Sequence, residues 1–385
     1  MTSPVPDIRL PTDLLPCDGR FGAGPSKIRP EALATLVAAS PTYLGTSHRQ
    51  RPVRAMVGRL RSGLRELFSL PDGYEVVLGN GGAALFWDVA TVSLIERRSQ
   101  HLSFGQFSAS FADTVAAAPH LEAPDVREAP PGSAPEARPG PGIDAYALTH
   151  NETSTGVAVP VTRPDGADPA ALVLVDATSA AGGMPVDPPA FDVYYFAPQK
   201  GLGSDGGLWL ALCSPAAVER AERIAASGRW IPAGLSLALA LENARLDQTY
   251  NTPALATLLL ATDQVEWILA QGGLAWAAAR CQSSADAIYR WAEGSSFARP
   301  FVEDPALRSP VVATIDFADT IDAATVAAVL RANGIVDTEP YRRLGRNQLR
   351  IGMYPAVDPA DVRVLTAAVD HVVEALAGPA GDPQP

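Results

Sequence analysis

Hydrophobic and polar positions along the chain predict a sheet of buried strands covered by helices. Short apolar runs rich in β-branched residues lie at 75–78, 145–149, 171–175 and 191–196. Such runs are typical of strands that are buried on both faces. Polar loops and stretches with helical spacing separate them up to about residue 215. This alternation predicts a mainly parallel sheet in one large α/β domain.

The pattern changes in the last third of the chain. Residues 254–279 have the composition of one long helical region that begins after Asn251, Thr252 and Pro253. An α+β pattern follows, with strands at 311–317, near Ile335 and at 348–354, and helices at 323–333 and 359–376. These elements predict a second, smaller domain.

Four parts of the chain are therefore expected. They are an N-terminal arm (1–25), a large α/β domain (26–270), a small α+β domain (271–377) and a disordered tail (378–385). The segment 123–142 is rich in Pro, Gly and Ala, and we predict a surface loop without regular structure there.

Two polar side chains follow predicted strands at the edge where open α/β sheets bind their ligands. Asp176 comes directly after 171–175, and Lys200 follows 191–196 after three residues. Lysine condenses with aldehydes and, when burial lowers its pKa, moves protons at neutral pH. A carboxylate beside a pyridine nitrogen keeps that nitrogen protonated. The pair favours a pyridoxal phosphate enzyme, with Lys200 in the Schiff base and Asp176 on the ring nitrogen.

Glycine-rich turns supply further candidate contacts. Residues 79–84 join a predicted strand to a predicted helix, and small residues at such a turn let backbone N–H groups hold a phosphate. Phe107 follows a short strand and is a candidate for stacking on a pyridine ring. Residues 201–206 fit the dinucleotide fingerprint G-x-G-x-x-G, but a predicted strand follows at 208–212 where that motif needs a helix. We interpret them as a loop beside the cofactor.

Composition narrows the class of protein. The chain has 385 residues and a formal net charge of −12, which excludes nonspecific binding to nucleic acid or to an anionic membrane. Its cysteines, Cys17, Cys213 and Cys281, are too widely spaced for a disulfide framework or a zinc site, and we expect no metal. No signal peptide is recognisable, and no apolar run approaches the roughly 18 residues of a membrane helix. A cytoplasmic protein is expected.

Basic residues gather at two places in this acidic chain. Arg342, Arg343, Arg346 and Arg350 lie within nine residues. Arginine binds carboxylate and phosphate through paired hydrogen bonds, so the cluster predicts a doubly anionic substrate, the alternative being a solvated surface. His48 and Arg49 form a second candidate pair on a loop before a helix.

These motifs, taken together, resemble the phosphoserine aminotransferases, which are class V, fold-type-I pyridoxal phosphate enzymes, and most closely their actinobacterial branch. The likeness runs from Phe21 to Leu376. Its motifs in order are FGAGPSK, GTSHR, GNGGA, HNETSTG, DATSAAGG, FAPQK, TYNTP and GIVDTEPYRRLGRNQLR.

The resemblance implies roles for single residues. Lys200 would bind the cofactor covalently and Asp176 would contact its ring nitrogen. The other cofactor contacts would be Phe107 on the ring, Thr153 on the phenolic oxygen, Ala83, Ala84 and Gln199 on the phosphate, and Asn251 and Thr252 on the same phosphate from the neighbouring subunit. The working unit would therefore be a homodimer. The substrate would be bound by His48, Arg49, Arg342, Arg343 and Arg350, the last on its α-carboxylate.

Two departures from the family pattern concern the substrate phosphate. Well-known members have an arginine where Ala84 aligns. They also have a His-Arg pair near the position of Arg342 and Arg343, and this pair aligns with them only when the alignment is shifted by one residue. Arg342 or Arg343, with Arg346 as a further candidate, would bind the phosphate together with His48 and Arg49.

The implied reaction is a reversible two-stage transamination. Glutamate would give up its amino group and leave as 2-oxoglutarate, and 3-phosphohydroxypyruvate would accept the group to become O-phosphoserine, a step of L-serine biosynthesis. Lys200 would carry the α-proton in both stages.

Three other functions remain open at this point. A different class V aminotransferase could act on another acidic oxo acid, because a few arginine changes would retune the site. A cysteine desulfurase needs a late nucleophilic cysteine, and no cysteine follows Cys281. A protein that only binds the cofactor would not need both Lys200 and Asp176.

Overall fold

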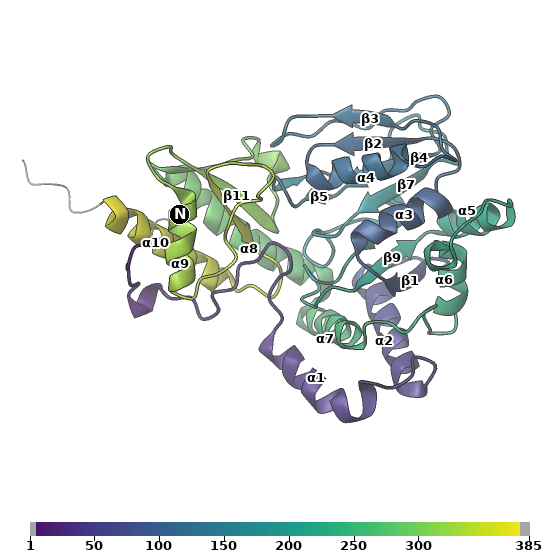
Figure 1. Ribbon diagram of the computed structural model, residues 1–385, viewed down its shortest axis with the longest axis horizontal. Coiled ribbons are helices and arrows are strands. Elements are labelled where there is room, and N and C mark those ends of the chain that lie inside the picture. Colours follow the sequence, from purple (N-terminus) through teal and green to yellow (C-terminus); the bar gives the residue numbers. More distant parts are fainter. Residues whose placement is uncertain (1–4, 378–385) are drawn as a thin grey trace, which may run out of the picture.

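A seven-stranded sheet forms the centre of the larger part of the molecule (Figure 1). The computed structural model describes residues 5–377, so the predicted disordered tail lies outside the described residues. The strands in spatial order are β1 (Glu75–Asn80), β9 (Leu208–Cys213), β8 (Val193–Phe196), β7 (Leu172–Asp176), β4 (Ala145–Thr149), β2 (Ser99–Ser103) and β3 (Asp125–Glu128). Strand β9 is antiparallel to β1 and β8, and the other neighbouring pairs are parallel. The mainly parallel sheet is confirmed.

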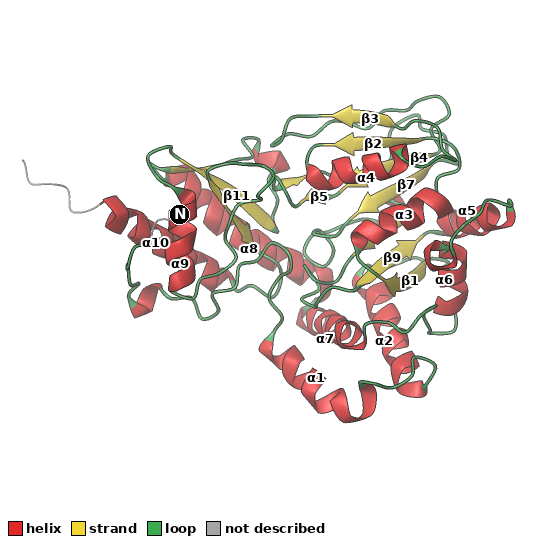
Figure 2. Cartoon of the chain, viewed as in Figure 1, coloured by secondary structure: helices red, strands yellow, loops and turns green. Residues whose placement is uncertain are grey.

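The sheet is buried on both faces because successive side chains of each strand point to opposite sides. In β7, Val173 and Val175 pack in one apolar core, while Leu172 and Leu174 pack in another. Helices α2 (Arg51–Leu67) and α7 (Leu255–Gln271) cover the first face. Helices α3 (Ala83–Ser93), α4 (Gln106–Ala116), α5 (Pro215–Ala226) and α6 (Leu237–Ala244) belong to the second face (Figure 2).

A three-stranded antiparallel sheet organises the smaller part, at the left of Figure 1. Its strands are β10 (Ala298–Pro300), β11 (Val312–Phe317) and β12 (Gln348–Gly352), and its helices are α8 (Gly273–Gly294), α9 (Ala323–Ala332) and α10 (Pro359–Ala377). Within the described residues, no helix in either part is both long and apolar enough to cross a membrane.

Residues from the N-terminal segment complete the core of this smaller part. Leu10 and Phe21 are buried in the same apolar cluster as α9 and α10. The Leu10 N–H donates to Asn333 Oδ1 at 3.0 Å, and the Phe21 N–H donates to the Val336 carbonyl at 3.2 Å. The segment is therefore fixed against a domain that lies more than 300 residues later in the sequence.

Three details of the predicted secondary structure were wrong. Strand β3 lies in the segment 123–142 that was predicted to be irregular; it is an edge strand, and alternate residues of it are only partly buried. The single long helix expected at 254–279 is interrupted at Gly272, whose φ of 125° ends α7 and lets α8 begin. The strand expected near Ile335 is only an isolated bridge between Val336 and Arg20.

Candidate active site

A cavity of about 320 Å³ opens at the carboxyl ends of the parallel strands and reaches the smaller part of the molecule. The predicted site residues that line it are Ala83, Ala84, Phe107, Thr153, Asp176, Gln199, Lys200 and Arg350. They come from strand ends, helix starts and one loop that are far apart in the sequence. The structure thus places most of the predicted cofactor residues around one space, together with Arg350.

Lys200 lies at the centre of this cavity with 7% of its surface exposed. Its Nζ donates a hydrogen bond to Thr153 Oγ1 at 2.8 Å. Gly24 packs directly against its stem: a Cβ at Gly24 would lie 2.7 Å from Lys200 Cε, and the φ of 149° also favours glycine. The motif FGAGPSK therefore covers the lysine with a backbone that has no side chain at the point of contact.

The surroundings of Lys200 favour its neutral form. Burial is the largest cause that lowers the pKa of its ammonium group to about 8. The negative charge of Asp176 acts against this shift, the positive charge of Arg350 adds to it, and Glu152 acts weakly against it. A pKa near 8 leaves a useful fraction of neutral amine at physiological pH. A neutral amine can attack an aldehyde and can accept a proton.

This pKa has a measurable consequence for stability. Because the pKa of Lys200 falls from 10.5 in the unfolded chain to about 8, the unfolded state binds more protons between these values. The free energy of unfolding that depends on Lys200 is therefore at its maximum above the pKa of the unfolded chain, and it falls as the pH is lowered towards the pKa of the folded chain. Between about pH 7 and about pH 10, we expect the free energy of unfolding of the wild type to rise by about 2 kcal/mol more than that of Lys200→Met.

Urea unfolding of the two ligand-free proteins at several pH values would measure this difference. An identical pH dependence of the free energy of unfolding in wild type and variant would contradict a lowered lysine pKa.

Asp176 is held in place by three donors at the end of β7. Its Oδ2 accepts a hydrogen bond from Trp87 Nε1 at 3.1 Å, and its Oδ1 accepts from the Thr178 N–H at 3.0 Å and from Thr178 Oγ1 at 2.6 Å. Sequence reasoning missed Trp87 and Thr178. Thr178 could have been found as the second residue after a strand-end Asp, where such bonds are common. Trp87, 89 residues away, gave no sequence signal.

A chain of hydroxyl groups supports Thr153 from behind. Thr153 Oγ1 donates to Ser179 Oγ at 2.8 Å, and Ser179 Oγ donates to the Asn151 carbonyl at 2.9 Å. The Asn151 side-chain amide also donates to Ser179 Oγ at 2.8 Å. Ser179 therefore fixes the hydroxyl that receives the Lys200 hydrogen bond, another contact that the sequence did not reveal.

Aromatic rings and Arg350 form the opposite wall. Lys200 Nζ lies 5.2 Å from the centre of the Phe107 ring, and the rings of Phe107 and Tyr341 are 5.9 Å apart. The Arg350 guanidinium lies 5.2 Å from the centre of the Tyr341 ring, and its Nη1 donates to the Thr153 carbonyl at 3.3 Å. Its Nε is buried and has no partner among the described residues. Arg350 thus lines the cavity and keeps donor capacity that no other described residue uses.

The start of α3 provides an anion site in the same cavity. Gly82 precedes the helix and no side chain caps it, so the first N–H groups of Ala83 and Ala84 lack the partners that an interior residue would have. Gln199 lines the same cavity, and its side-chain NH₂ is a further donor group there. Free N–H groups and the helix dipole favour a negatively charged ligand such as phosphate.

Four predicted site residues lie outside this cavity and form a separate cluster. His48 Nδ1 and Thr252 Oγ1 are 2.9 Å apart, and Arg49 Nη1 donates to Gln248. Asn251 lines a neighbouring cavity, and none of the four lines the Lys200 cavity of its own chain. Burial, with a further contribution from Arg49, lowers the pKa of His48. This polar cluster does not meet Lys200 within one chain.

The four arginines of the segment 342–350 have three different surroundings. Arg350 lines the cavity, whereas Arg342 and Arg343 are exposed and neither lines it. Arg346 makes two hydrogen bonds to Asp316, and its guanidinium lies 4.4 Å from the centre of the Phe301 ring. The side chain of Arg346 is thus engaged in a structural ion pair. Its role as a further phosphate ligand stays a prediction.

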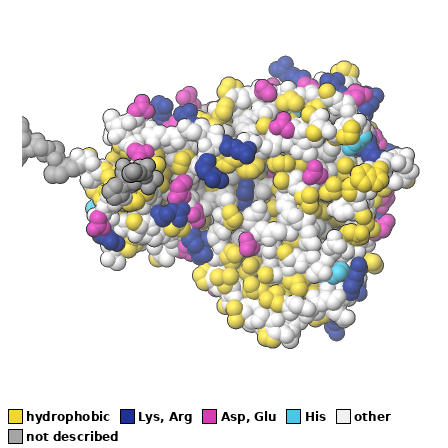
Figure 3. Space-filling model, viewed as in Figure 1, with side chains coloured by type: hydrophobic (Ala, Val, Ile, Leu, Met, Phe, Trp, Pro, Cys, Tyr) yellow, Lys and Arg dark blue, Asp and Glu magenta, His cyan; other side chains and the backbone are white. Residues whose placement is uncertain are grey.

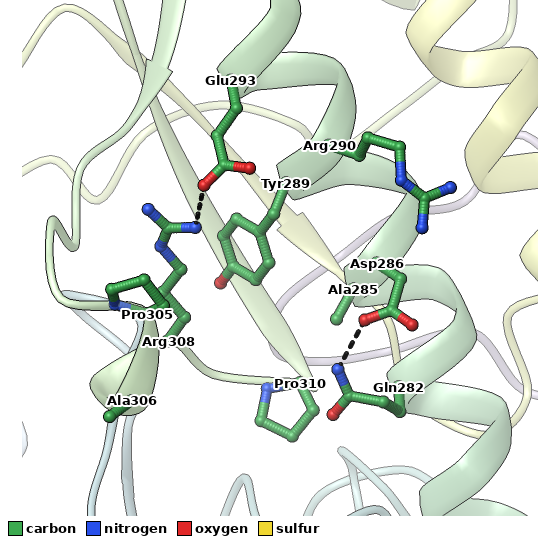
Figure 4. Close-up of a pocket in the computed structure, with 10 residues that line it drawn as sticks. All are labelled: Gln282, Ala285, Asp286, Tyr289, Arg290, Glu293, Pro305, Ala306, Arg308 and Pro310. Carbon is green, nitrogen blue, oxygen red and sulfur yellow. Dashed lines mark hydrogen bonds and ion pairs between the residues drawn. The ribbon is translucent and has the colours of Figure 1, made fainter.

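A second large cavity, of about 550 Å³, lies in the smaller part between α8 and residues 305–310 (Figure 4). Three of its charged side chains have partners in the lining: Arg308 binds Glu293 at 2.5 Å, and Asp286 accepts a hydrogen bond from Gln282 at 2.7 Å. It has neither a lysine nor a cysteine in its lining. The Lys200 cavity is the better candidate for chemistry. No group of three or more His, Cys, Asp or Glu residues in positions 5–377 could hold a metal ion.

Comparison with known proteins gives consistent relatives. Residues 138–362 match the class V aminotransferase family. The chain is 62% identical over 370 residues to the phosphoserine aminotransferase of Nocardioides sp. strain JS614, and this alignment covers 96% of this chain and 99% of that protein.

Solved structures agree on the fold. The phosphoserine aminotransferase from Cytophaga hutchinsonii matches with a TM-score of 0.85 at 24% identity and covers 93% of this chain and 100% of that one. A pyridoxal phosphate-bound phosphoserine aminotransferase from Trichomonas vaginalis matches with a TM-score of 0.76 at 20% identity and covers 92% and 99% of the two chains.

Proposed function

The chain belongs to the class V aminotransferase family, and from this we infer that it is a phosphoserine aminotransferase of fold type I that uses pyridoxal phosphate. It transfers the amino group of glutamate to 3-phosphohydroxypyruvate and yields 2-oxoglutarate and O-phosphoserine, in the biosynthesis of L-serine. Identity of 62% over nearly the whole of a phosphoserine aminotransferase is the observation that carries this function. A cytoplasmic location remains a prediction from the sequence.

The cavity fits the cofactor group by group. The uncapped start of α3 is suited to the phosphate, and the side-chain NH₂ of Gln199, which lines the same cavity, would be a further donor to it. Asp176 would contact the ring nitrogen, Thr153 the phenolic oxygen, and Phe107 the face of the ring. Lys200 is the amine that the aldehyde requires. The bound cofactor supplies an electron-poor ring that accepts the electron pair released when the substrate loses its α-proton.

The chain's own residues would then bind the substrate and move its proton. Arg350 has free donors at the cavity wall and would hold the α-carboxylate of glutamate or phosphoserine in a paired hydrogen bond. Lys200 Nζ, with its pKa near 8, would accept the α-proton and return it within the same cavity. Asp176, fixed by Trp87 and Thr178, would keep its negative charge against the ring nitrogen.

We propose that the working unit is a homodimer in which His48, Arg49, Asn251 and Thr252 serve the cavity of the partner subunit. Support comes from their position in a polar cluster that does not line the cavity of their own chain. Helix α1 (Pro30–Tyr43) lies near this cluster at the lower end of Figure 1 and exposes Leu33 and Val37, the latter to 72%. Figure 3 shows hydrophobic side chains at this lower end of the molecule. An apolar surface of this kind suits a subunit contact.

The substrate phosphate would be recognised by His48 and Arg49 of one subunit together with Arg342 or Arg343 of the other. The two arginines lie on the loop that also carries Tyr341, which lines the Lys200 cavity. Their exposure in a single chain is compatible with a ligand that bridges two subunits.

An absorbance titration of the purified protein tests this function. We expect phosphoserine and glutamate to abolish the visible band of bound pyridoxal phosphate, whereas serine, which lacks the phosphate, should need a concentration at least about 100-fold higher. Loss of charge-assisted hydrogen bonds to a phosphate accounts for a difference of this size. If serine removed the band as readily as phosphoserine, a class V aminotransferase for another oxo acid would replace this proposal.

A further inference from the structure

Glu152 is a buried carboxylate that none of the roles above uses. It follows Asn151 in the short strand β5 (Asn151–Glu152), directly before Thr153, and its side chain is fully buried. It makes no salt bridge with another described residue. Burying a charge without a partner is costly unless hydrogen bonds compensate it. The contacts of this carboxylate therefore need an explanation.

Five donor groups lie within hydrogen-bond distance of Glu152. Its Oε2 receives the N–H groups of Phe107 at 3.1 Å and Ser108 at 2.9 Å, and Ser108 Oγ lies 3.0 Å away. Its Oε1 receives the Ser154 N–H at 3.1 Å and Ser154 Oγ at 2.7 Å. The carboxylate thus joins two segments that are about 45 residues apart in the sequence.

The first of these segments is the start of α4, which has no cap of its own. Gly105 precedes the helix and has no side chain to accept a hydrogen bond. The Gln106 N–H donates instead to Ser154 Oγ at 3.0 Å, and the next two N–H groups donate to Glu152. Glu152 of β5 and Ser154 in the turn after it therefore satisfy the helix start, and the negative charge lies where the helix dipole favours it.

Gly105 shows independently that this arrangement depends on close contact. A Cβ at Gly105 would lie 2.3 Å from Glu152 Cγ and 2.6 Å from Ser154 Oγ. Its φ of 177° is ordinary extended backbone, so glycine is needed for space and not for its conformation. Any larger residue at position 105 would push the carboxylate away from the helix start.

The two joined segments carry two walls of the active-site cavity. The first bears Phe107, whose ring lies 5.2 Å from Lys200 Nζ, and the second bears Thr153, which accepts the Lys200 hydrogen bond. We propose that Glu152 is a positioning residue for catalysis, because it fixes Phe107 relative to Thr153 and Lys200. This inference rests on the proposed pyridoxal phosphate function.

The isosteric variant Glu152→Gln tests the proposal. An amide retains one acceptor oxygen and directs an NH₂ group at donors that now have no acceptor, so the start of α4 should loosen. We expect the dissociation constant of pyridoxal phosphate, measured by titrating cofactor-free protein, to rise about tenfold, which corresponds to about 1.4 kcal/mol. The visible circular dichroism of the bound cofactor should also weaken, because the Phe107 ring no longer has a single orientation.

A double-mutant cycle with Phe107→Leu separates positioning from general stabilisation. If Glu152 acts through Phe107, Glu152→Gln should raise the dissociation constant less than about twofold in the Phe107→Leu background. Ser154→Ala removes part of the same network and should shift the constant in the same direction by a smaller factor. This milder variant keeps the test possible if Glu152→Gln does not fold.

Asp144→Asn is the matched control. The Asp144 carboxylate accepts the N–H groups of Glu96, Arg97 and Arg98 at 2.7–2.9 Å but does not line the cavity. It should lower the melting temperature and leave the dissociation constant unchanged. If Glu152→Gln behaves like this control, or if its tenfold effect persists in Phe107→Leu, the positioning role is wrong. If the wild type itself binds no pyridoxal phosphate, the proposed function fails instead.

Discussion

Replacing Lys200 with alanine is expected to lower the rate constant of transamination by about 10⁴-fold or more, because the variant would lack both the amine that binds the cofactor and the group that moves the α-proton. The cavity offers no second lysine, since the only other lysine of the chain is Lys27. Single-turnover measurements with glutamate, using protein saturated with pyridoxal phosphate, would give this rate directly.

The matched control is Lys27→Ala. The Lys27 ammonium lies 3.4 Å from Asp18 and outside the Lys200 cavity, so its loss should leave turnover within about twofold of wild type. Borohydride reduction of the loaded wild type followed by peptide mapping should find the cofactor on Lys200 and not on Lys27. A Lys200→Ala protein with more than about 10% of wild-type turnover would show that another group does the proton transfer.

Replacing Asp176 with asparagine is expected to lower kcat on the order of 10²–10³-fold, because it would remove the preorganised negative charge proposed to lie beside the ring nitrogen of the cofactor. The substitution also acts on Lys200 in a predictable direction. Asp176 raises the pKa of that ammonium group, so its loss should move the pKa below about 8 and leave more neutral amine at pH 7. Turnover should fall although the amine becomes more available.

The pH dependence of cofactor association distinguishes these two effects. The midpoint of the association rate should shift to lower pH in Asp176→Asn, while kcat stays low at every pH. Asp192→Asn is a suitable control, because Asp192 is also a buried carboxylate of the large sheet but binds Arg163 and lies away from the cavity. An unchanged midpoint in Asp176→Asn would mean that this carboxylate does not act on Lys200.

The sequence was informative wherever a local pattern decides the structure. Val173, Val175 and their neighbours form an uninterrupted apolar run, so the strand and its polar end at Asp176 were predictable. Lys200 was predictable for the same reason. Edge strand β3 was not, because it is only half buried and its residues DVRE resemble a loop.

The supporting contacts could not be predicted because they join segments that are distant in the sequence. Trp87 reaches Asp176 across 89 residues, and Glu152 reaches Phe107 across 45. Neither contact follows from spacing or composition. The domain boundaries, the homodimer and the roles of Arg342 and Arg343 stay predictions.

The contact of Leu10 and Phe21 with the last third of the chain has a consequence for biosynthesis. These two residues leave the ribosome more than 300 residues before their partners Asn333 and Val336. At ordinary rates of translation that interval is roughly 15–60 s. During this interval, the segment that carries Leu10 and Phe21 cannot yet make its contacts with the smaller part, although the strands of the large sheet are already being made. The core of the smaller part can thus be completed only after residues 333–336 have left the ribosome.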